Sequence, residues 1–109
     1  MSYDMHKCKI TVLKRTLNQD LAQEYLETES NFGACEQFSD GQEFVLETLE
    51  MPEGFCLWAW ADIRGDIMTI MAGGDLPWIK QRGVTITGCT DWFRPVHFEI
   101  ERSDEESPV

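Results

Sequence analysis

Four cysteines are the residues of this chain with the widest chemistry, and they stand at Cys8, Cys35, Cys56 and Cys89. A thiolate acts as a nucleophile and as a ligand for soft metal ions. No two of the four lie close enough in sequence to form a zinc knuckle or a CxxC redox motif. A site would have to form from cysteines that are distant in sequence, and Cys35, Cys56 and Cys89 each lie at the edge of an expected segment.

Cys56 stands in the stretch PEGFCLWAWADI, where Pro52 and Gly54 precede the expected start of a long helix. Free backbone N–H groups and the positive end of the helix dipole stabilise a thiolate in the first turn. Cys56 also begins an apolar stripe with Trp60 and Ile63, and free cysteines are among the most buried residues of proteins. Two interpretations stay open at this point, a reactive or ligating thiolate and a core side chain.

Three thiolates beside a helix N-terminus would suit zinc or iron with one coordination position open. They would equally suit a thiol-reactive or redox ligand. We therefore expect Cys35, Cys56 and Cys89 to form a site for a metal ion or for such a ligand. His97 alternates with apolar neighbours on the outward face of its expected strand, so we do not expect it to be a ligand.

The four tryptophans all lie between residues 58 and 92, among several aspartates. Aromatic faces beside carboxylates suit an ammonium ion or amine, and Trp58, Trp92 and Asp91 are the candidates for such a pocket. The alternative is that these rings pack in the core or cover helix ends. In TDWFRP, Asp91 and Arg94 stand three residues apart, a spacing that suits either a brace within a hairpin or contact with a ligand.

The formal net charge is −11, and residues 16–63 contain eleven acids but no Lys or Arg. Nucleic-acid binding normally depends on Lys and Arg that neutralise phosphates, so we expect neither nucleic acid nor an anionic membrane as a partner. An acidic surface would attract a cationic ligand or partner instead. The early basic residues Lys7, Lys9, Lys14 and Arg15 are expected to lie against acidic neighbours.

No apolar run approaches the ~18 residues of a membrane span. The N-terminal residues lack the apolar stretch of a signal peptide. We therefore expect a cytoplasmic protein whose cysteines are reduced.

Two periodic patterns of hydrophobic residues, one of two residues and one of three to four, indicate the strands and helices that position these residues. Alternation predicts strands at 7–14, 41–47, 84–89 and 96–102, and spacing of three and four predicts helices at 19–26 and 55–71. We expect one α+β domain over residues 1–102, in which the long helix packs on a mostly antiparallel sheet of about four strands and the second helix is short. Residues 103–109 are expected to form an acidic, disordered tail.

Several of these segments also resemble a family of small bacterial and archaeal proteins that has no established activity. The resemblance rests on KCKITVLKR, on the Cys35 segment leading into GQEF, on PEGFCLWAWADI and on CTDWFRPVHFEIER. In that family the positions matching Cys35, Cys56 and Cys89 are commonly cysteine, which implies a shared role for the three. A proline often follows the first of them, whereas this chain has Glu36, and Cys8 is not part of the pattern.

No catalytic triad, phosphate-binding loop or paired-carboxylate motif is visible, so enzymatic activity has no direct support in the sequence. The leading hypothesis is a small cytosolic protein that binds a metal ion or a thiol-reactive ligand through Cys35, Cys56 and Cys89. One alternative is an acidic, non-enzymatic interaction module or homodimer that serves a larger partner. Another is a pocket for a cationic small molecule, lined by tryptophan and aspartate.

Overall fold

The computed structural model describes residues 5–27 and 33–106, and its elements follow the predicted order of strand, helix, strand, helix, strand, strand. They are β1 (His6–Arg15), α1 (Gln19–Tyr25), β2 (Glu43–Leu46), α2 (Leu57–Met71), β3 (Val84–Gly88) and β4 (Val96–Glu106). The α+β class predicted from the sequence is confirmed.

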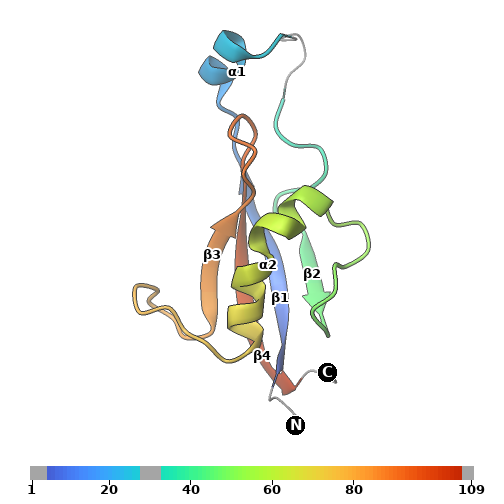
Figure 1. The fold of residues 1–109 in the computed structure, drawn as a ribbon, viewed down its shortest axis with the longest axis vertical. Helices are drawn as coiled ribbons and strands as arrows, with labels where there is room; N and C mark the ends of the chain where they lie inside the picture. The colour runs from blue at the N-terminus through green and yellow to red at the C-terminus, as the bar shows by residue number, and fades with distance from the viewer. Residues whose placement is uncertain (1–4, 28–32, 107–109) are drawn as a thin grey trace.

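The strands form one antiparallel sheet in the order β2-β1-β4-β3, with β1 and β4 at its centre (Figure 1). The β3–β4 hairpin agrees with the prediction, whereas the place of β1 between β2 and β4 depends on pairing between distant segments. Ile10 lies opposite Phe44 on one side and opposite Ile100 on the other. Because directly opposite residues share a face, these side chains form one row of the core.

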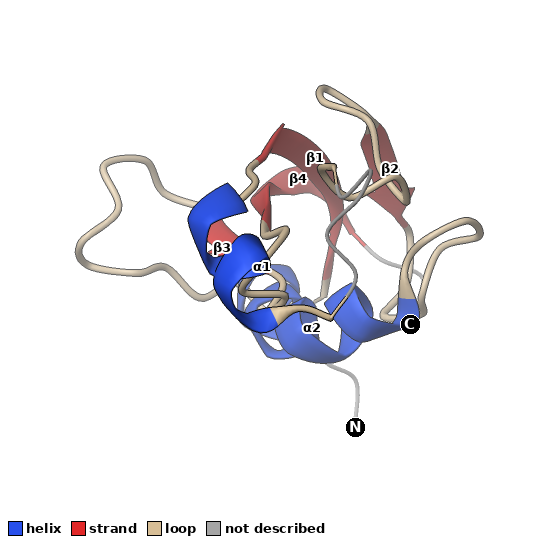
Figure 2. Ribbon diagram, turned by 90° about the horizontal axis from the view of Figure 1, so that it is seen from above, coloured by secondary structure: helices blue, strands red, loops and turns tan. Residues whose placement is uncertain are grey.

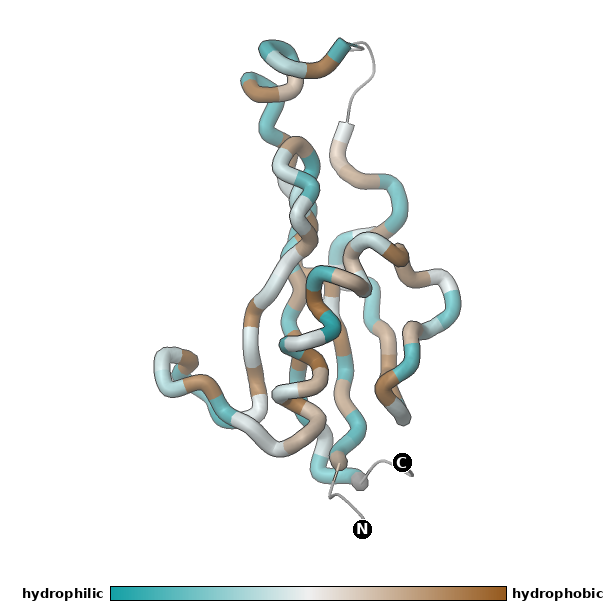
Figure 3. Tube along the Cα trace, viewed as in Figure 1, coloured by the Kyte–Doolittle hydropathy of each residue, from teal (hydrophilic) through white to brown (hydrophobic). Residues whose placement is uncertain are grey.

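Helix α2 lies along one face of the sheet (Figure 2). Its predicted apolar stripe is buried, with Ile63, Ile67 and Ile70 fully inaccessible to solvent. Hydrophobic and hydrophilic residues alternate along the strands that it covers (Figure 3), so each strand turns one set of side chains toward α2. The core therefore lies between α2 and one face of the sheet.

The basic first strand lies against acidic neighbours, as expected. Lys9 Nζ lies 3.4 Å from a carboxylate oxygen of Glu43 on β2 and 3.9 Å from one of Glu101 on β4. Arg15 Nε lies 3.0 Å from Asp40 Oδ1 in the turn before β2. These pairs lie at or near the surface, and they neutralise part of the charge of the central strands.

Strand β4 continues to Glu106, four residues beyond the end at residue 102 that the sequence predicts for the last strand. The first strand begins at His6, which supplies backbone partners for this extension, and His6 lies opposite Glu106. Lys7 Nζ also lies 3.2 Å from Glu105 Oε2. The sequence suggests a solvated tail here, but Glu105 of this acidic segment pairs with a lysine on the neighbouring strand. Residues 107–109 of the expected tail lie outside the described residues.

A cluster of phenylalanines closes the core near the start of α2. The ring centroid of Phe38 lies 5.0 Å from that of Phe55 and 5.2 Å from that of Phe98, in edge-to-face arrangements. Phe38 follows Cys35 by three residues, and Phe55 directly precedes Cys56. Packing of these rings therefore brings two cysteine-bearing segments to the same end of the core.

The molecule is elongated, with principal extents of 52 × 30 × 23 Å. Its radius of gyration is 15.6 Å, whereas a compact chain of this length has a value of about 13 Å. The difference arises because α1 and the loop between β3 and β4 extend beyond the sheet (Figure 1).

Candidate functional site

Three of the four cysteines line one cavity of about 130 Å³, which we call the three-cysteine cavity. Cys35 comes from the segment before β2, Cys56 from the start of α2, and Cys89 from the position after β3. All three are half-buried and none forms a disulfide. Three segments that are distant in sequence therefore bring a cysteine each to one cavity.

The surroundings of Cys8 and Cys56 differ, although both residues contact the core. Cys8 is 1% exposed in the core, and this burial raises the pKa of its thiol to about 12. Cys56 is half-buried, and it packs against the core while also lining the cavity. Cys8 is thus a core side chain, whereas the role of Cys56 as a reactive or ligating thiolate stays a prediction.

Cys56 is the N-cap of α2 and lies one residue before the first helical position. Its carbonyl accepts the first helical hydrogen bond, from Trp60 N at 2.9 Å, but its side chain makes no capping hydrogen bond. No acidic side chain stands in the first turn of the helix. The positive end of the α2 dipole is therefore not offset by a carboxylate of its own first turn.

The backbone around Cys89 supplies a hydrogen bond to its sulfur. Val96 N donates to Cys89 Sγ at 3.3 Å, and Cys89 N donates to Val96 O at 3.1 Å, which closes the base of the β3–β4 loop. These two hydrogen bonds fix the position of the Cys89 sulfur atom. Cys35 is fixed differently, because Arg15 Nη1 donates to its carbonyl oxygen at 3.0 Å while the Nε of Arg15 pairs with Asp40.

The wall formed by Trp58 is held by a chain of hydrogen bonds. Trp58 Nε1 donates to Thr90 Oγ1 at 2.9 Å, and the N–H and hydroxyl of Thr90 donate to Asp62 Oδ2 at 2.7 and 2.9 Å. Because Asp62 lies one turn along α2, this chain joins the helix to the loop that carries Cys89. Trp58 therefore lines the cavity in a fixed position although its side chain is 62% exposed.

Asp91 and Arg94 brace the β3–β4 loop and also line the cavity. Asp91 Oδ1 accepts hydrogen bonds from the backbone N–H groups of Phe93 and Arg94, both at 3.0 Å. Asp91 Oδ2 accepts another from Arg94 Nε at 3.4 Å. The lining residues of the cavity include Trp58 and Asp91 but not Trp92, which is 69% exposed. The residues expected around a cationic ligand are thus only partly brought together.

Metal binding by the cysteines finds no direct geometric support. Among residues 5–27 and 33–106, no three His, Cys, Asp or Glu side chains are grouped so that they could hold a metal ion. Zinc requires sulfur ligands at about 2.3 Å from one centre, and Cys89 Sγ instead faces a backbone donor. Binding of zinc or iron stays a prediction.

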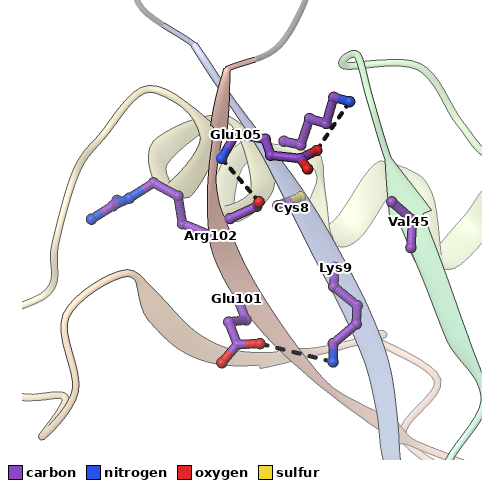
Figure 4. A pocket seen from close by; sticks show the side chains of 8 residues that line it. Cys8, Lys9, Val45, Glu101, Arg102 and Glu105 are labelled. Atoms are coloured by element: carbon purple, nitrogen blue, oxygen red, sulfur yellow. Dashed lines mark hydrogen bonds and ion pairs between the residues drawn. The ribbon is translucent and has the colours of Figure 1, made fainter.

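A larger cavity of about 290 Å³ lies beside β1, β2 and β4 (Figure 4). Its lining residues are Lys7, Cys8, Lys9 and Val45, together with Glu101, Arg102, Ser103 and Glu105 of β4. Each lysine already forms an ion pair, Lys7 with Glu105 and Lys9 with Glu101 among others. The lysines of this cavity are thus already paired with carboxylates, whereas the three-cysteine cavity is lined by three free cysteines. The three-cysteine cavity is therefore the stronger candidate site despite its smaller volume.

Sequence reasoning missed three side chains that matter here, Gln37, Thr90 and Asp62. Gln37 lines the cavity, and the other two fix its tryptophan wall. Thr90 lies in CTDWFRP directly after Cys89, which is a usable signal. Asp62 is one of the aspartates interleaved with the tryptophans, but nothing in the sequence indicates that it pairs with Thr90.

No protein-family model, no curated protein and no solved structure matches this chain. The resemblance to a family of small bacterial and archaeal proteins stays a prediction based on the quoted motifs. Within the part of the chain that the structure describes, no helix combines the length and apolar character needed to cross a membrane.

Proposed function

We propose that this protein binds a small thiol-reactive ligand in the three-cysteine cavity. The observation that carries the proposal is that Cys35, Cys56 and Cys89 line one cavity of about 130 Å³ while staying half-buried. A fully buried thiol resists ionisation, as Cys8 does, whereas a half-buried one can react with a ligand that enters from solvent.

The walls of the cavity favour an organic ligand over a metal ion. Phe38, Trp58, Ala59 and Val96 supply apolar surface, and the ring of Trp58 offers a face for a planar group. A metal site would instead need ligands that converge on one point, and the described side chains form no such group. A small, planar and soft electrophile fits both the walls and the thiols.

The chemistry that fits is addition of a thiolate to an α,β-unsaturated carbonyl compound. The sulfur of one cysteine forms a bond to the β-carbon, the electron pair of the carbon–carbon double bond moves toward the carbonyl, and the resulting enolate takes a proton from water. No oxidant and no leaving group are required. The hydrogen bond from Val96 N fixes the position of the Cys89 sulfur, which is one of the three candidate nucleophiles.

Labelling of the native protein with N-ethylmaleimide, read out by peptide mass spectrometry, tests the proposal. We expect one adduct per chain, distributed over Cys35, Cys56 and Cys89, because the first adduct fills the cavity and shields the other two thiols. Cys8 should react only after unfolding, which makes it an internal control.

Three outcomes of this experiment would count against the proposal. Equal and independent labelling of all three thiols would indicate separate exposed cysteines and no shared cavity. No labelling before unfolding would assign all four to the core. Protection of the three thiols by added zinc or ferrous ion, with stoichiometric metal retained by the protein, would favour the metal hypothesis.

A further inference from the structure

The end of the molecule farthest from the start of β1 and the end of β4 carries exposed apolar side chains. We define the projecting arm as α1 together with the β3–β4 loop, residues 89–95; both extend beyond the sheet in Figure 1. Asn18 joins the two parts, because its backbone N–H donates to Phe93 O at 2.9 Å and its side-chain amide donates to Trp92 O at 2.6 Å. Tyr25 and Trp92 are 72% and 69% exposed.

Helix α1 has little support of its own. It has seven residues, fewer than the ~12 below which an isolated helix is marginal in water. Its N-cap, Asn18, makes no side-chain capping hydrogen bond, and Ala22 is its one buried residue. Within the described chain α1 packs against no other helix or strand. A short helix of this kind gains stability when its apolar residues, Leu21 and Tyr25, are covered.

The charge of the projecting arm indicates what would cover it. Asp20, Glu24 and Glu27 are exposed on or beside α1, and residues 16–63 contain no Lys or Arg. In the β3–β4 loop, Arg94 is held by Asp91. A second copy of this chain would bring the same acids into contact and add to a net charge of −11. Charge complementarity therefore favours a basic occupant.

We propose that the projecting arm docks a basic amphipathic segment of another protein. Its apolar residues would cover Leu21, Tyr25 and Trp92, and its Lys or Arg side chains would face the three acids of α1 and its C-terminal end. Exposed aromatic side chains are typical anchors of such interfaces, and the surrounding acids accelerate encounter and fix orientation.

The probe for this interaction is a synthetic amphipathic peptide of leucine and lysine, with a fluorescent label. Its anisotropy is measured against the full-length protein and against a Tyr25→Ser/Trp92→Ser variant at physiological ionic strength. We expect saturable binding to the native protein and binding weaker by about tenfold or more to the variant. Trp78→Ser is the matched control, since Trp78 is 75% exposed in the loop between α2 and β3, away from α1.

Equal binding by the arm variant and the Trp78→Ser control would overturn the proposal, because the peptide would then follow net charge alone. Equally tight binding of an oligolysine peptide of the same charge would overturn it for the same reason. Sedimentation of the native protein as a dimer that the arm substitutions dissociate would assign the arm to a second copy of the chain. Unchanged thermal unfolding of each variant shows that a loss of binding is local.

Discussion

The four cysteines of the chain lie in different surroundings. Cys8 lies among core side chains, where the charged thiolate is poorly solvated. Cys89 receives a backbone hydrogen bond, and Cys56 stands at the start of a helix. One residue type thus packs in the core at one position and lines the three-cysteine cavity at three others.

The raised pKa of Cys8 predicts a loss of stability in alkaline solution. The unfolded chain loses this proton near the usual value of 9.0, whereas the folded chain keeps it to about 12. Between these values the free energy of unfolding should fall by about 1.4 kcal/mol per pH unit from this residue. Below pH 9 both states hold the proton, and the contribution is constant.

Urea unfolding of the native protein and of Cys8→Ala from neutral pH into this window measures the effect. Lysines and tyrosines titrate in both proteins, so the difference between the two slopes isolates Cys8. Parallel slopes would show that its thiol ionises equally in the folded and unfolded chains.

At the scale of elements, α2 joins the core to the candidate site. Its apolar stripe is buried against the sheet, while Asp62 and Asp66 on another face accept hydrogen bonds from Thr90 and Thr87. The helix therefore fixes the end of β3 and the start of the β3–β4 loop as well as its own Cys56. Strengthening the helix should stabilise the fold without moving the cavity.

Gly65→Ala is the substitution that tests this expectation. Gly65 is exposed within α2, and an added Cβ would meet nothing within 4 Å. Alanine in place of glycine in a helix stabilises by about 1 kcal/mol, so the melting temperature should rise. Gly73→Ala is the control, because Gly73 has a φ of +94° and alanine there should destabilise. A lower melting temperature for Gly65→Ala would contradict the expectation.

At the scale of the whole molecule, Arg102 holds together the region where α2 ends, whereas the three-cysteine cavity lies where α2 begins. Its Nη1 donates to the carbonyls of Ile70 and Gly74 at 3.1 and 2.8 Å, and Nη2 donates to Asp75 Oδ1 at 2.9 Å. The guanidinium group, aided by Gly83 N, holds the pKa of Asp75 below its usual value. A residue of β4 thereby caps α2 and anchors the loop that leads to β3.

Arg102→Leu should lower the free energy of unfolding by about 2–3 kcal/mol, because several hydrogen bonds to a charged group are lost and carbonyls at the end of α2 lose their donor. Chemical unfolding measures the change. Arg82→Leu removes the same charge from an exposed position in the α2–β3 loop, and it should cost less than about 0.5 kcal/mol. If both substitutions lowered the free energy of unfolding equally, Arg102 would contribute only through its charge and not through its hydrogen bonds.

The two hydrophobic periods of the sequence determined the local elements. Alternation at Cys8, Ile10 and Val12 predicts the buried face of β1, and spacing along α2 predicts the buried Ile63 and Ile67. These predictions succeed because the direction of a side chain depends on backbone geometry over a few residues. The class of fold and the β3–β4 hairpin follow from the order of such elements.

Only the tertiary structure decided which distant residues meet. Strand order, the extension of β4 opposite His6 and the burial of Cys8 relative to Cys56 all depend on contacts between segments far apart in sequence. The same holds for the candidate site, since Thr90 and Asp62 become partners only when α2 lies beside the β3–β4 loop. Local periodicity does not encode these long-range contacts. The contacts bring the three cysteines to one cavity and leave α1 projecting from the sheet.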